Sequence, residues 1–430
     1  MILSDEPDVI VVGAGPAGCT AAYALAKSGM DVTLVERGEK TGDKNVSGGV
    51  LFGRVLHRLI PRFWEEAPIE RIIRTHRVSM VDNKASLTVD YTDESLAEEP
   101  YNAFSIIRAD FDRWFASKAE DAGALLANGV RVDGVVKKNG RVVGIRSGDE
   151  IVRSKVVIAA DGVNSLVAED AGLRKRPTDQ QVALGIKEVY GLSEEAINER
   201  FGLLGNDGVA HSFLGATEGI PGGGFLYTNR ASISVGVVVL LTGFQRSKID
   251  SREIIDRFTS TPIVRRAIRD GLLLEYSAHL VPEGGYSAIR QLSDDGILVV
   301  GDAAGLVLNL GFSFEGMNYA IGSGMAAAKA ILKAHKKNDF SKGSLREYDC
   351  ILQRNFMLKD FKTYKGLTKV FGNPRLYSDY PEVIMHLARD SFISDLVPRQ
   401  RLVTRAIFKF LSDIPLPHLI KDGLELIRGL

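Results

Sequence analysis

The stretch DVIVVGAGPAGCTAAYALAKSGMDVTLVERG, residues 8–38, decides the fold. An apolar run over 8–12 leads into a glycine-rich turn, and an alanine-rich segment leads into a second apolar run over 31–35 that ends in Glu36. This order is typical of a strand, a tight turn, a helix and a second parallel strand. Such a unit usually holds a dinucleotide, but it does not say which one.

Each glycine of the turn has a separate task in such a unit. Gly13 permits the tight turn, Gly15 lets the backbone approach a pyrophosphate, and Gly18 lets the helix pack closely on the strand. Amide groups at the helix start then hold the phosphates. Glu36 would accept hydrogen bonds from ribose hydroxyls and would repel a 2′-phosphate. The stretch therefore predicts a dinucleotide site.

Two further apolar runs end in the same way, VVIAADG over 156–162 and ILVVGDAAG over 297–305. Their near-continuous Val, Ile and Ala predict parallel strands covered on both faces, and ligands bind at the carboxyl ends of such strands. Asp302 would contact a ribityl hydroxyl; its alternative role is the N-cap of the next helix. A glycine-rich helix start within GFSFEGMN, 311–318, would place amide groups near N1 and O2 of a reduced isoalloxazine. Three such ends favour FAD.

Composition limits the function further. A chain of 430 residues exceeds what one core normally serves, so we expect two intertwined domains or one large domain with a sizeable insertion. Lys plus Arg and Asp plus Glu both number 54, which gives no global support for a nucleic-acid partner. The two cysteines, Cys19 and Cys350, predict neither a disulfide framework nor a self-held iron–sulfur cluster, and no metal site is expected. Without a secretory signal or a long uninterrupted apolar run, we expect a cytoplasmic chain that spans no membrane.

The material between the three runs predicts an antiparallel second domain. Residues 77–93 read as two strands around the turn at Asp82-Asn83, and residues 222–240 read as two strands around a turn at 228–230. Such a sheet would form one wall of a substrate cavity. Residues 108–124 have helical spacing with a buried aromatic stripe, and Asp110 is the expected N-cap.

The predicted fold is α/β: a Rossmann-like FAD-binding domain with an inserted antiparallel-sheet substrate domain and a C-terminal helical region. The predicted boundaries are 1–75, 105–185 and 286–335 for the FAD-binding domain, 76–104 and 186–285 for the substrate domain, and 336–430 for the helical region.

Several motifs together resemble a known superfamily. VGAGPAG, ERG, IIRADFD, ADGVNS and GDAAG resemble the FAD-binding superfamily of geranylgeranyl reductases and aromatic hydroxylases, from residue 8 to about residue 330. More specific are DKNVSGG, GGGFLYTN, EYSAHLVPEGG, NLGFSFEGMNYAI and YPEVIMHLARDSF. These resemble the FixC branch of the electron-transfer-flavoprotein:quinone oxidoreductases over nearly the full length.

The resemblance implies that FAD takes electrons from an electron-transfer flavoprotein and that they pass to a membrane quinone. Arg108 would meet phosphate or ribose, with a surface ion pair as its alternative role. Carried over to this sequence, the implied cofactor-binding residues are Gly13, Gly15, Pro16, Ala17, Gly18, Glu36, Arg37, Lys44, Asn45, Val46, Ser47, Gly48, Arg108, Ala160, Asp161, Gly162, Gly301, Asp302, Gly316 and Met317.

The cysteine count departs from the single-chain oxidoreductases, which carry a four-cysteine ferredoxin-like module. In the FixC branch the cluster resides on a separate small ferredoxin-like subunit, which the two cysteines here fit. The implied setting is a FixABCX-like complex at the inner face of the cell membrane. It would contain the alpha and beta subunits of the electron-transfer flavoprotein, and in some members it is electron-bifurcating.

No nucleophile or general base is expected, because the chemistry belongs to the flavin. Tyr227 would offer a hydroxyl to a quinone oxygen or be an ordinary strand residue, and His279 is interpreted as structural. The C-terminal stretch 399–430 mixes apolar and basic residues, which suits an interfacial helix, a docking surface or a helix packed on its own domain. The residues expected to line the quinone slot are Gly223, Gly224, Phe225, Tyr227, Phe312 and Phe314.

Two other functions remain open at this point. One is an isoprenoid reductase that uses the same fold to saturate the double bonds of a geranylgeranyl lipid. The other is a non-enzymatic prenyl-binding protein that has lost its flavin, against which the retained Glu36, Asp302 and loop glycines argue. A hydroxylase is disfavoured because no second glycine fingerprint for a nicotinamide domain occurs.

Overall fold

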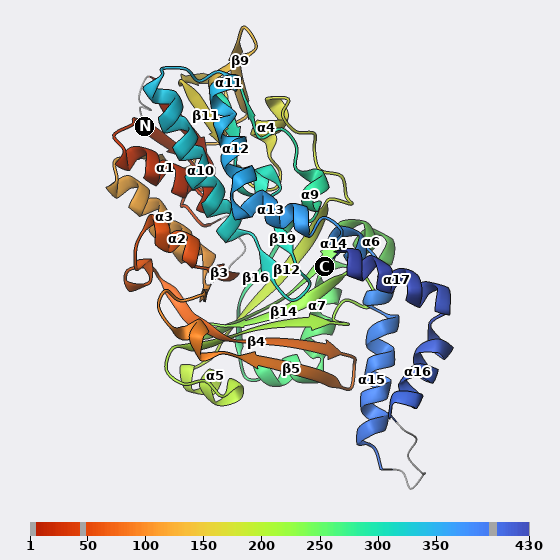
Figure 1. The fold of residues 1–430 in the computed structure, drawn as a ribbon. Coiled ribbons are helices and arrows are strands. Elements are labelled where there is room, and N and C mark those ends of the chain that lie inside the picture. Colours follow the sequence, from red (N-terminus) through yellow and green to blue (C-terminus); the bar gives the residue numbers. More distant parts are fainter. Residues whose placement is uncertain (1–5, 44–48, 395–401, 430) are drawn as a thin grey trace.

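The computed structural model describes residues 6–43, 49–394 and 402–429. A six-stranded sheet with its covering helices forms the upper part of the view, a nine-stranded sheet crosses the lower part, and the C-terminal helices project at the lower right (Figure 1). The α/β class, the Rossmann-like domain and the C-terminal helices are as the sequence predicts.

The six-stranded sheet brings together the three apolar runs that lie far apart in the chain. Val9 pairs with Val32 on one side and with Val156 on the other, and Val157 pairs with Ile297, all in parallel. The carboxyl ends of the three runs therefore share one edge of the sheet. Its strands, in spatial order, are β17 (Ser293–Asp294), β18 (Ile297–Val299), β11 (Val156–Ala159), β1 (Val9–Val12), β2 (Val32–Val35) and β7 (Leu125–Ala127).

Both faces of this sheet are covered, which explains the lack of polar alternation in its strands. On one face α1 (Pro16–Lys27) packs between α3 (Arg108–Asp121) and α10 (Met317–Lys336). On the other face a small sheet packs against β11 through β9. The small sheet consists of β8 (Gly134–Lys138), β9 (Arg141–Ser147) and β10 (Glu150–Arg153).

The nine-stranded sheet contains both predicted hairpins. Two amides of the first turn donate to Asp82 Oδ1 at 2.7 Å, and the second turn lies at 229–231. Only β4 and β13 pair in parallel among the described strands of this sheet. Its strands are β16 (Leu272–Pro282), β12 (Val182–Gly191), β15 (Ser232–Leu240), β14 (Gly222–Thr228), β13 (Asp207–Leu214), β4 (Ile69–Val81), β6 (Ala103–Ile106), β3 (Gly49–Phe52) and, paired with β4, β5 (Ser86–Thr92).

Helices α5 (Glu194–Phe201), α7 (Ser251–Ser260) and α8 (Pro262–Ile268) pack on one face of this sheet and close a second apolar core. Part of the other face remains as the wall of a cavity. The remaining short elements are α2 (Arg54–Leu59), η1 (Phe63–Glu65), η2 (Glu94–Ala97), α4 (Leu166–Asp170), α6 (Leu241–Ser247), α9 (Gly285–Ala288), η3 (Gly301–Ala304), β19 (Leu308–Asn309) and β20 (Phe314–Glu315).

The C-terminal region is helical throughout its described part. Helix α17 is held to the body by Asp422, which accepts from the Arg375 guanidinium at 2.6 and 2.7 Å and from Tyr380 at 2.9 Å. No helix of the described residues is long and apolar enough to cross a bilayer. The elements are α11 (Lys342–Leu345), α12 (Glu347–Arg354), α13 (Phe356–Thr363), α14 (Leu367–Phe371), η4 (Pro374–Leu376), α15 (Asp379–Phe392), α16 (Leu402–Asp413) and α17 (Leu416–Gly429).

The expectation that Asp110 caps α3 is wrong. The helix begins at Arg108, with Ile107 at the N-cap position, and the Phe111 amide donates to the Ile107 carbonyl at 2.9 Å. Asp110 instead lies in the first turn, where its charge favours the positive end of the helix. The aromatic stripe is confirmed as core, because Phe111 and Phe115 are wholly buried.

Gly18 is expected to be irreplaceable for packing, since a Cβ at this position would overlap the carbonyl oxygen of Gly13. Gly18→Ala should lower the free energy of unfolding by about 1–3 kcal/mol. The new methyl group would force the backbone of α1 or of the Gly13 turn to move, and either movement would disturb the packing against β1. The matched control is Gly423→Ala in α17, where a Cβ meets no atom within 4 Å; it should stabilise the protein by about 0.5–1 kcal/mol. Urea titrations of both variants, prepared without flavin, would measure this. Equal stability of the two variants would contradict the packing role.

Candidate flavin and quinone site

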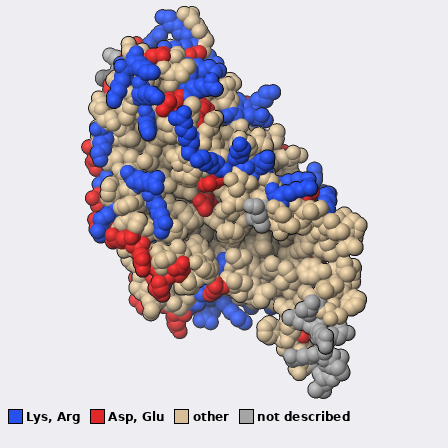
Figure 2. Space-filling model, viewed as in Figure 1, with Lys and Arg blue, Asp and Glu red and all other residues tan. Residues whose placement is uncertain are grey.

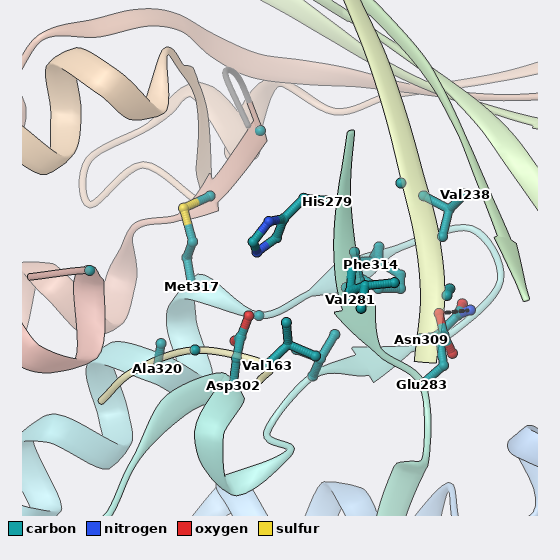
Figure 3. Close-up of a pocket in the computed structure, with 18 of the residues that line it drawn as sticks. Val163, Val238, His279, Val281, Glu283, Asp302, Asn309, Phe314, Met317 and Ala320 are labelled. Carbon is teal, nitrogen blue, oxygen red and sulfur yellow. Dashed lines mark hydrogen bonds between the residues drawn. The ribbon is translucent and has the colours of Figure 1, made fainter. Parts of the chain in front are cut away.

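A cavity of about 790 Å³ lies between the strand ends of the six-stranded sheet and the open face of the nine-stranded sheet. Figure 3 shows part of its wall, with Asp302 and Met317 on one side and Glu283 and Asn309 on the other. The expected residues that line it are Gly13, Gly15, Pro16, Ala17, Glu36, Arg37, Arg108, Ala160, Asp161, Gly162, Asp302, Gly316, Met317, Gly223, Gly224, Phe225, Tyr227, Phe312 and Phe314.

Two of the predicted residues within the described chain do not line this cavity. Gly18 and Gly301 lie behind its wall, where a Cβ on Gly301 would come within 2.9 Å of the Ala17 side chain. Lys44, Asn45, Val46, Ser47 and Gly48 lie outside the described residues.

The glycine loop has the geometry that its predicted tasks require. Gly13 has φ +106°, and a Cβ there would overlap the carbonyl oxygen of Ala160. Gly15 has φ −80°, and a Cβ there would meet no atom within 4 Å. Gly15 is also the N-cap of α1 and offers no side-chain cap, so the first amides of the helix are available to an anion. The open space at Gly15 fits the close approach of a pyrophosphate.

Glu36 is fixed at the end of β2 by two backbone amides. Its Oε2 accepts from Ala14 at 3.0 Å, and its Oε1 accepts from Gly38 at 2.8 Å. A carboxylate oxygen can accept two hydrogen bonds, so each oxygen retains capacity for a ribose hydroxyl.

Two aspartates at the other strand ends have capacity for a ligand. Asp161 Oδ2 accepts from the Val167 amide at 2.9 Å, whereas Oδ1 is buried and has no hydrogen-bond partner among the described residues. Burial raises the pKa of Asp161 to about 6. Burial also raises the pKa of Asp302, and the positive charges of Arg108 and Arg174 partly offset that rise. Asp302 lies within η3, whose N-cap is Val300, so it does not cap that helix. Hydroxyl donors of a ribityl chain fit these carboxyls.

Arg108 makes an ion pair inside the cavity wall. Its Nε and Nη2 donate to the two carboxylate oxygens of Asp112 at 3.0 and 2.8 Å, and Asp112 is buried. Burial opposes the charge of Arg108, but the carboxylates of Asp112 and Asp302 outweigh it and raise its pKa. The bidentate pair therefore keeps the Arg108 guanidinium protonated and fixes its position beside the cavity.

Beyond Asp302 the wall is formed by the start of α10. Gly316 is its N-cap, without a side-chain cap, so amide groups are available at this point. His279 of β16 lies across from Met317 in the cavity (Figure 3), although the sequence suggested a structural role. Burial and the charges of Arg108 and Arg37 lower the pKa of His279, so the imidazole is neutral at pH 7.

The titratable wall residues that sequence reasoning missed include Lys187 and Glu283. Burial lowers the pKa of Lys187 to about 7, and burial raises the pKa of Glu283 to about 7. Lys187 shares a strand face with Ala183 and Gly185, which also line the cavity. A lysine in the apolar run VALGIKEV was a signal for it. Glu283 lies in the quoted motif EYSAHLVPEGG, but nothing local indicates which way its side chain points.

The strand ends, the open helix start and the carboxyls define an FAD-dependent oxidoreductase. Residues 6–349 match the FAD binding domain family, and residues 357–430 match the ETF-QO/FixC family C-terminal domain. Protein FixC of Salmonella typhi is 43% identical over 422 residues, which covers 97% of both chains. A probable electron transfer flavoprotein-quinone oxidoreductase, YdiS of Escherichia coli strain K12, is 39% identical over 422 residues and 98% of both chains. The chain belongs to the ETF-QO/FixC family.

Solved structures support the fold. A geranylgeranyl bacteriochlorophyll reductase-like protein from Thermoplasma acidophilum superimposes with a TM-score of 0.71 at 22% identity, over 97% of this chain and 99% of that chain. The myxobacterial chondrochloren halogenase, described as FAD-dependent, gives 0.62 at 19% identity, over 99% and 90%. With the matched family, this confirms FAD as the cofactor and disfavours the flavin-free prenyl-binding alternative.

Gly15→Val should strongly weaken flavin binding without unfolding the protein. The new side chain enters open space at an unstrained backbone position, but it occupies the surface that the phosphates approach. We expect FAD affinity to fall about a hundredfold or more, which is about 3 kcal/mol. Flavin absorbance per protein after dialysis against FAD measures the loss, and the variant should unfold thermally like flavin-stripped wild type. Full flavin occupancy would contradict the assigned loop.

Proposed function

We propose that this protein accepts electrons from an electron-transfer flavoprotein and passes them to a quinone. The observation that carries the proposal is one continuous cavity that joins the flavin-binding strand ends to an apolar end beside the C-terminal helices. When bound, FAD supplies chemistry that accepts and releases electrons singly or in pairs. The names of the relatives, FixC and a probable electron transfer flavoprotein-quinone oxidoreductase, support this assignment.

The apolar end of the cavity suits a flat, lipid-soluble ring. Val238, Val281, Phe314 and Phe371 contribute to its wall. At Gly224 a Cβ would come within 2.5 Å of the Phe258 ring, which belongs to the core on the other face of the sheet, so Gly224 borders the cavity with its backbone alone. Such surroundings exclude water and favour an apolar ligand over a polar one.

Tyr227 offers a hydroxyl within this wall. Its ring stacks on Phe225 with centroids 5.0 Å apart and planes at 19°. Burial raises its pKa, so the hydroxyl keeps its proton and can donate to a quinone oxygen. Phe312 and Gly223 complete the proposed quinone surface.

The proposed partners are those that the resemblance to the FixC branch implies. The described residues contain no group of three or more metal-ligating side chains, and the whole sequence has two cysteines, which is compatible with these partners. An iron–sulfur cluster in the electron path would therefore reside on a small ferredoxin-like subunit. We extend the proposal to a FixABCX-like complex with the alpha and beta subunits of an electron-transfer flavoprotein, in which electron bifurcation would be a property of the assembly.

An apolar surface, defined by the exposed apolar residues of α16 and α17, lies beside the apolar end of the cavity. Phe371 and Tyr377 line the cavity, and α14, which contains Phe371, packs against α17. Most of the surface over α15–α17 in this view is free of charged side chains, with Lys and Arg along its upper edge (Figure 2). We propose that it rests on the inner face of the cell membrane and admits quinone. Its residues are Ile407, Phe408, Leu411, Leu416, Ile420, Leu424, Leu426 and Ile427.

Two basic residues of the C-terminal stretch are paired with carboxylates. Arg405 pairs with Asp390 at 2.8 Å, and Lys409 pairs with Asp413 at 2.7 Å. Basic side chains that are already paired with carboxylates attract anionic lipid less strongly. The proposed membrane contact therefore depends mainly on the apolar side chains.

The direct test of function is electron transfer to a quinone by the purified protein. The bound flavin is reduced anaerobically with dithionite and mixed with a short-chain quinone, and its absorbance is followed by stopped flow. We expect reoxidation that saturates with quinone concentration, because the quinone must first occupy the cavity. Absence of reoxidation, or hydrogenation of a geranylgeranyl lipid by the reduced protein, would contradict the proposal and favour an isoprenoid reductase.

The membrane contact predicts a selective effect of charge on α16 and α17. Phe408 and Ile427 are 68% and 76% exposed, so Phe408→Asp with Ile427→Asp should leave thermal stability unchanged. Partitioning onto anionic vesicles in a sedimentation assay should fall about tenfold or more. The control is Val89→Asp with Tyr91→Asp on β5, where the side chains are 67% and 57% exposed. Equal partitioning of the two double variants would argue against this surface.

A further inference from the structure

Glu283 is an acidic residue at the apolar end of the cavity. It directly follows β16 and lines the cavity, from which it is partly accessible. In Figure 3, Glu283 and Asn309 lie together beside Val238, on the opposite side from Asp302 and Met317. A ligand that reaches Glu283 therefore lies beyond the residues assigned to the ribityl chain.

Asn309 holds the Glu283 carboxyl in place. Its Nδ2 donates to Glu283 Oε1 at 3.1 Å, and its own Oδ1 accepts from the Gly311 amide at 2.8 Å. The Asn309 side chain is therefore held by a backbone amide of the β19–β20 hairpin, and it in turn fixes one oxygen of the Glu283 carboxyl. The other oxygen, Oε2, accepts no hydrogen bond from a described residue, and Glu283 borders the cavity.

The surroundings favour the protonated form of Glu283. Apolar side chains form this end of the wall, and burial raises the pKa of Glu283 to about 7, which the Asn309 hydrogen bond partly offsets. Tyr377 is a titratable side chain that senses the charge of Glu283. Burial and the Glu283 charge raise the pKa of Tyr377, and the Tyr377 hydroxyl donates to the Phe371 carbonyl at 3.1 Å. A carboxyl with this pKa can both hold and release a proton near neutral pH.

We propose that the Glu283 carboxyl donates a proton to one oxygen of the quinone as it is reduced, and that Asn309 positions the carboxyl for this transfer. The inference rests on the proposed function. The quinone gains two electrons from the reduced flavin cofactor and two protons. The O–H bond of Glu283 breaks and an O–H bond forms on the quinone; water supplies the second proton and later reprotonates the carboxylate.

The pH dependence has a definite sign. Below pH 7 the carboxyl carries the proton, and above it the donor is lost roughly tenfold for each pH unit. Stability follows a related course because the folded pKa lies above that of the unfolded chain. The stabilisation is present below the unfolded pKa, about 4.3, and is lost as the pH rises through about 7.

The test compares wild type with Glu283→Gln, which keeps an acceptor for Asn309 but carries no exchangeable acid proton. Reoxidation of dithionite-reduced flavin by a short-chain quinone is measured from pH 5.5 to 9. At pH 6 we expect the variant to react about tenfold or more slowly, with a flat profile, whereas the wild-type rate falls above pH 7. Affinity for a redox-inactive quinone analogue should change less than about threefold, because the substitution conserves shape.

A second readout needs neither flavin nor quinone. As the pH rises from about 4.5 to 8, the Tm of flavin-free wild type should fall relative to that of Glu283→Gln, because wild type alone loses the stabilisation of the protonated carboxyl. The matched control for the rate measurement is Asp349→Asn. Asp349 lies outside the cavity, burial also raises its pKa, and its carboxyl accepts a hydrogen bond from Ser293. This control should keep the wild-type rate profile for the quinone reaction.

The outcomes separate this inference from the proposed function. An unchanged rate profile in Glu283→Gln overturns the proton-donor role while quinone reduction stands, whereas a wild type that never reduces quinone overturns both. Should Glu283→Gln not fold, Asn309→Ala provides the test. It removes a hydrogen bond that favours the charged carboxylate, so the fall in rate should move to higher pH. A fall that stays at the wild-type pH would contradict the positioning role.

Discussion

The parallel register of β1, β11 and β18 is the constraint on which the rest of this structure depends. Val9 opposite Val156, and Val157 opposite Ile297, place three turns from distant parts of the chain on one edge of a sheet. Gly15, Asp161 and Asp302 follow these strands and all line the same cavity. A shift of one residue in any of these pairs would move a carboxyl away from that edge. The buried faces of the strands keep the register, so core packing and cofactor binding are coupled.

The nine-stranded sheet and the C-terminal helices extend this edge into a two-ended cavity. One end has backbone amides and carboxyls, as an extended polar cofactor requires, and the other has aromatic and aliphatic side chains with glycines on β14. The helical region closes the apolar end through α14 and η4, while α16 and α17 present apolar side chains outward. The cavity thus runs from a hydrogen-bonding end to an apolar end beside the C-terminal helices.

Much of this arrangement could be predicted from local sequence. The three apolar runs, the glycine loop and both hairpins depend on period and turn chemistry that a few residues carry. The N-cap of α3 could not be predicted, because the chain enters that helix directly after β6. Arg108, the first residue of the helix, turns its side chain toward Asp112. The Lys187 and Glu283 side chains were missed because strand pairing, which is nonlocal, decides which face of β12 and which end of β16 borders the cavity.

The most direct test of the central claim is an experimental structure of the protein purified with its flavin. We predict one extended FAD, with its pyrophosphate against the Gly15 backbone, its ribityl chain beside Asp302 and its ring facing the wall formed by β14. A flavin bound elsewhere, or bound while Gly15, Asp161 and Asp302 remain remote from it, would contradict the account.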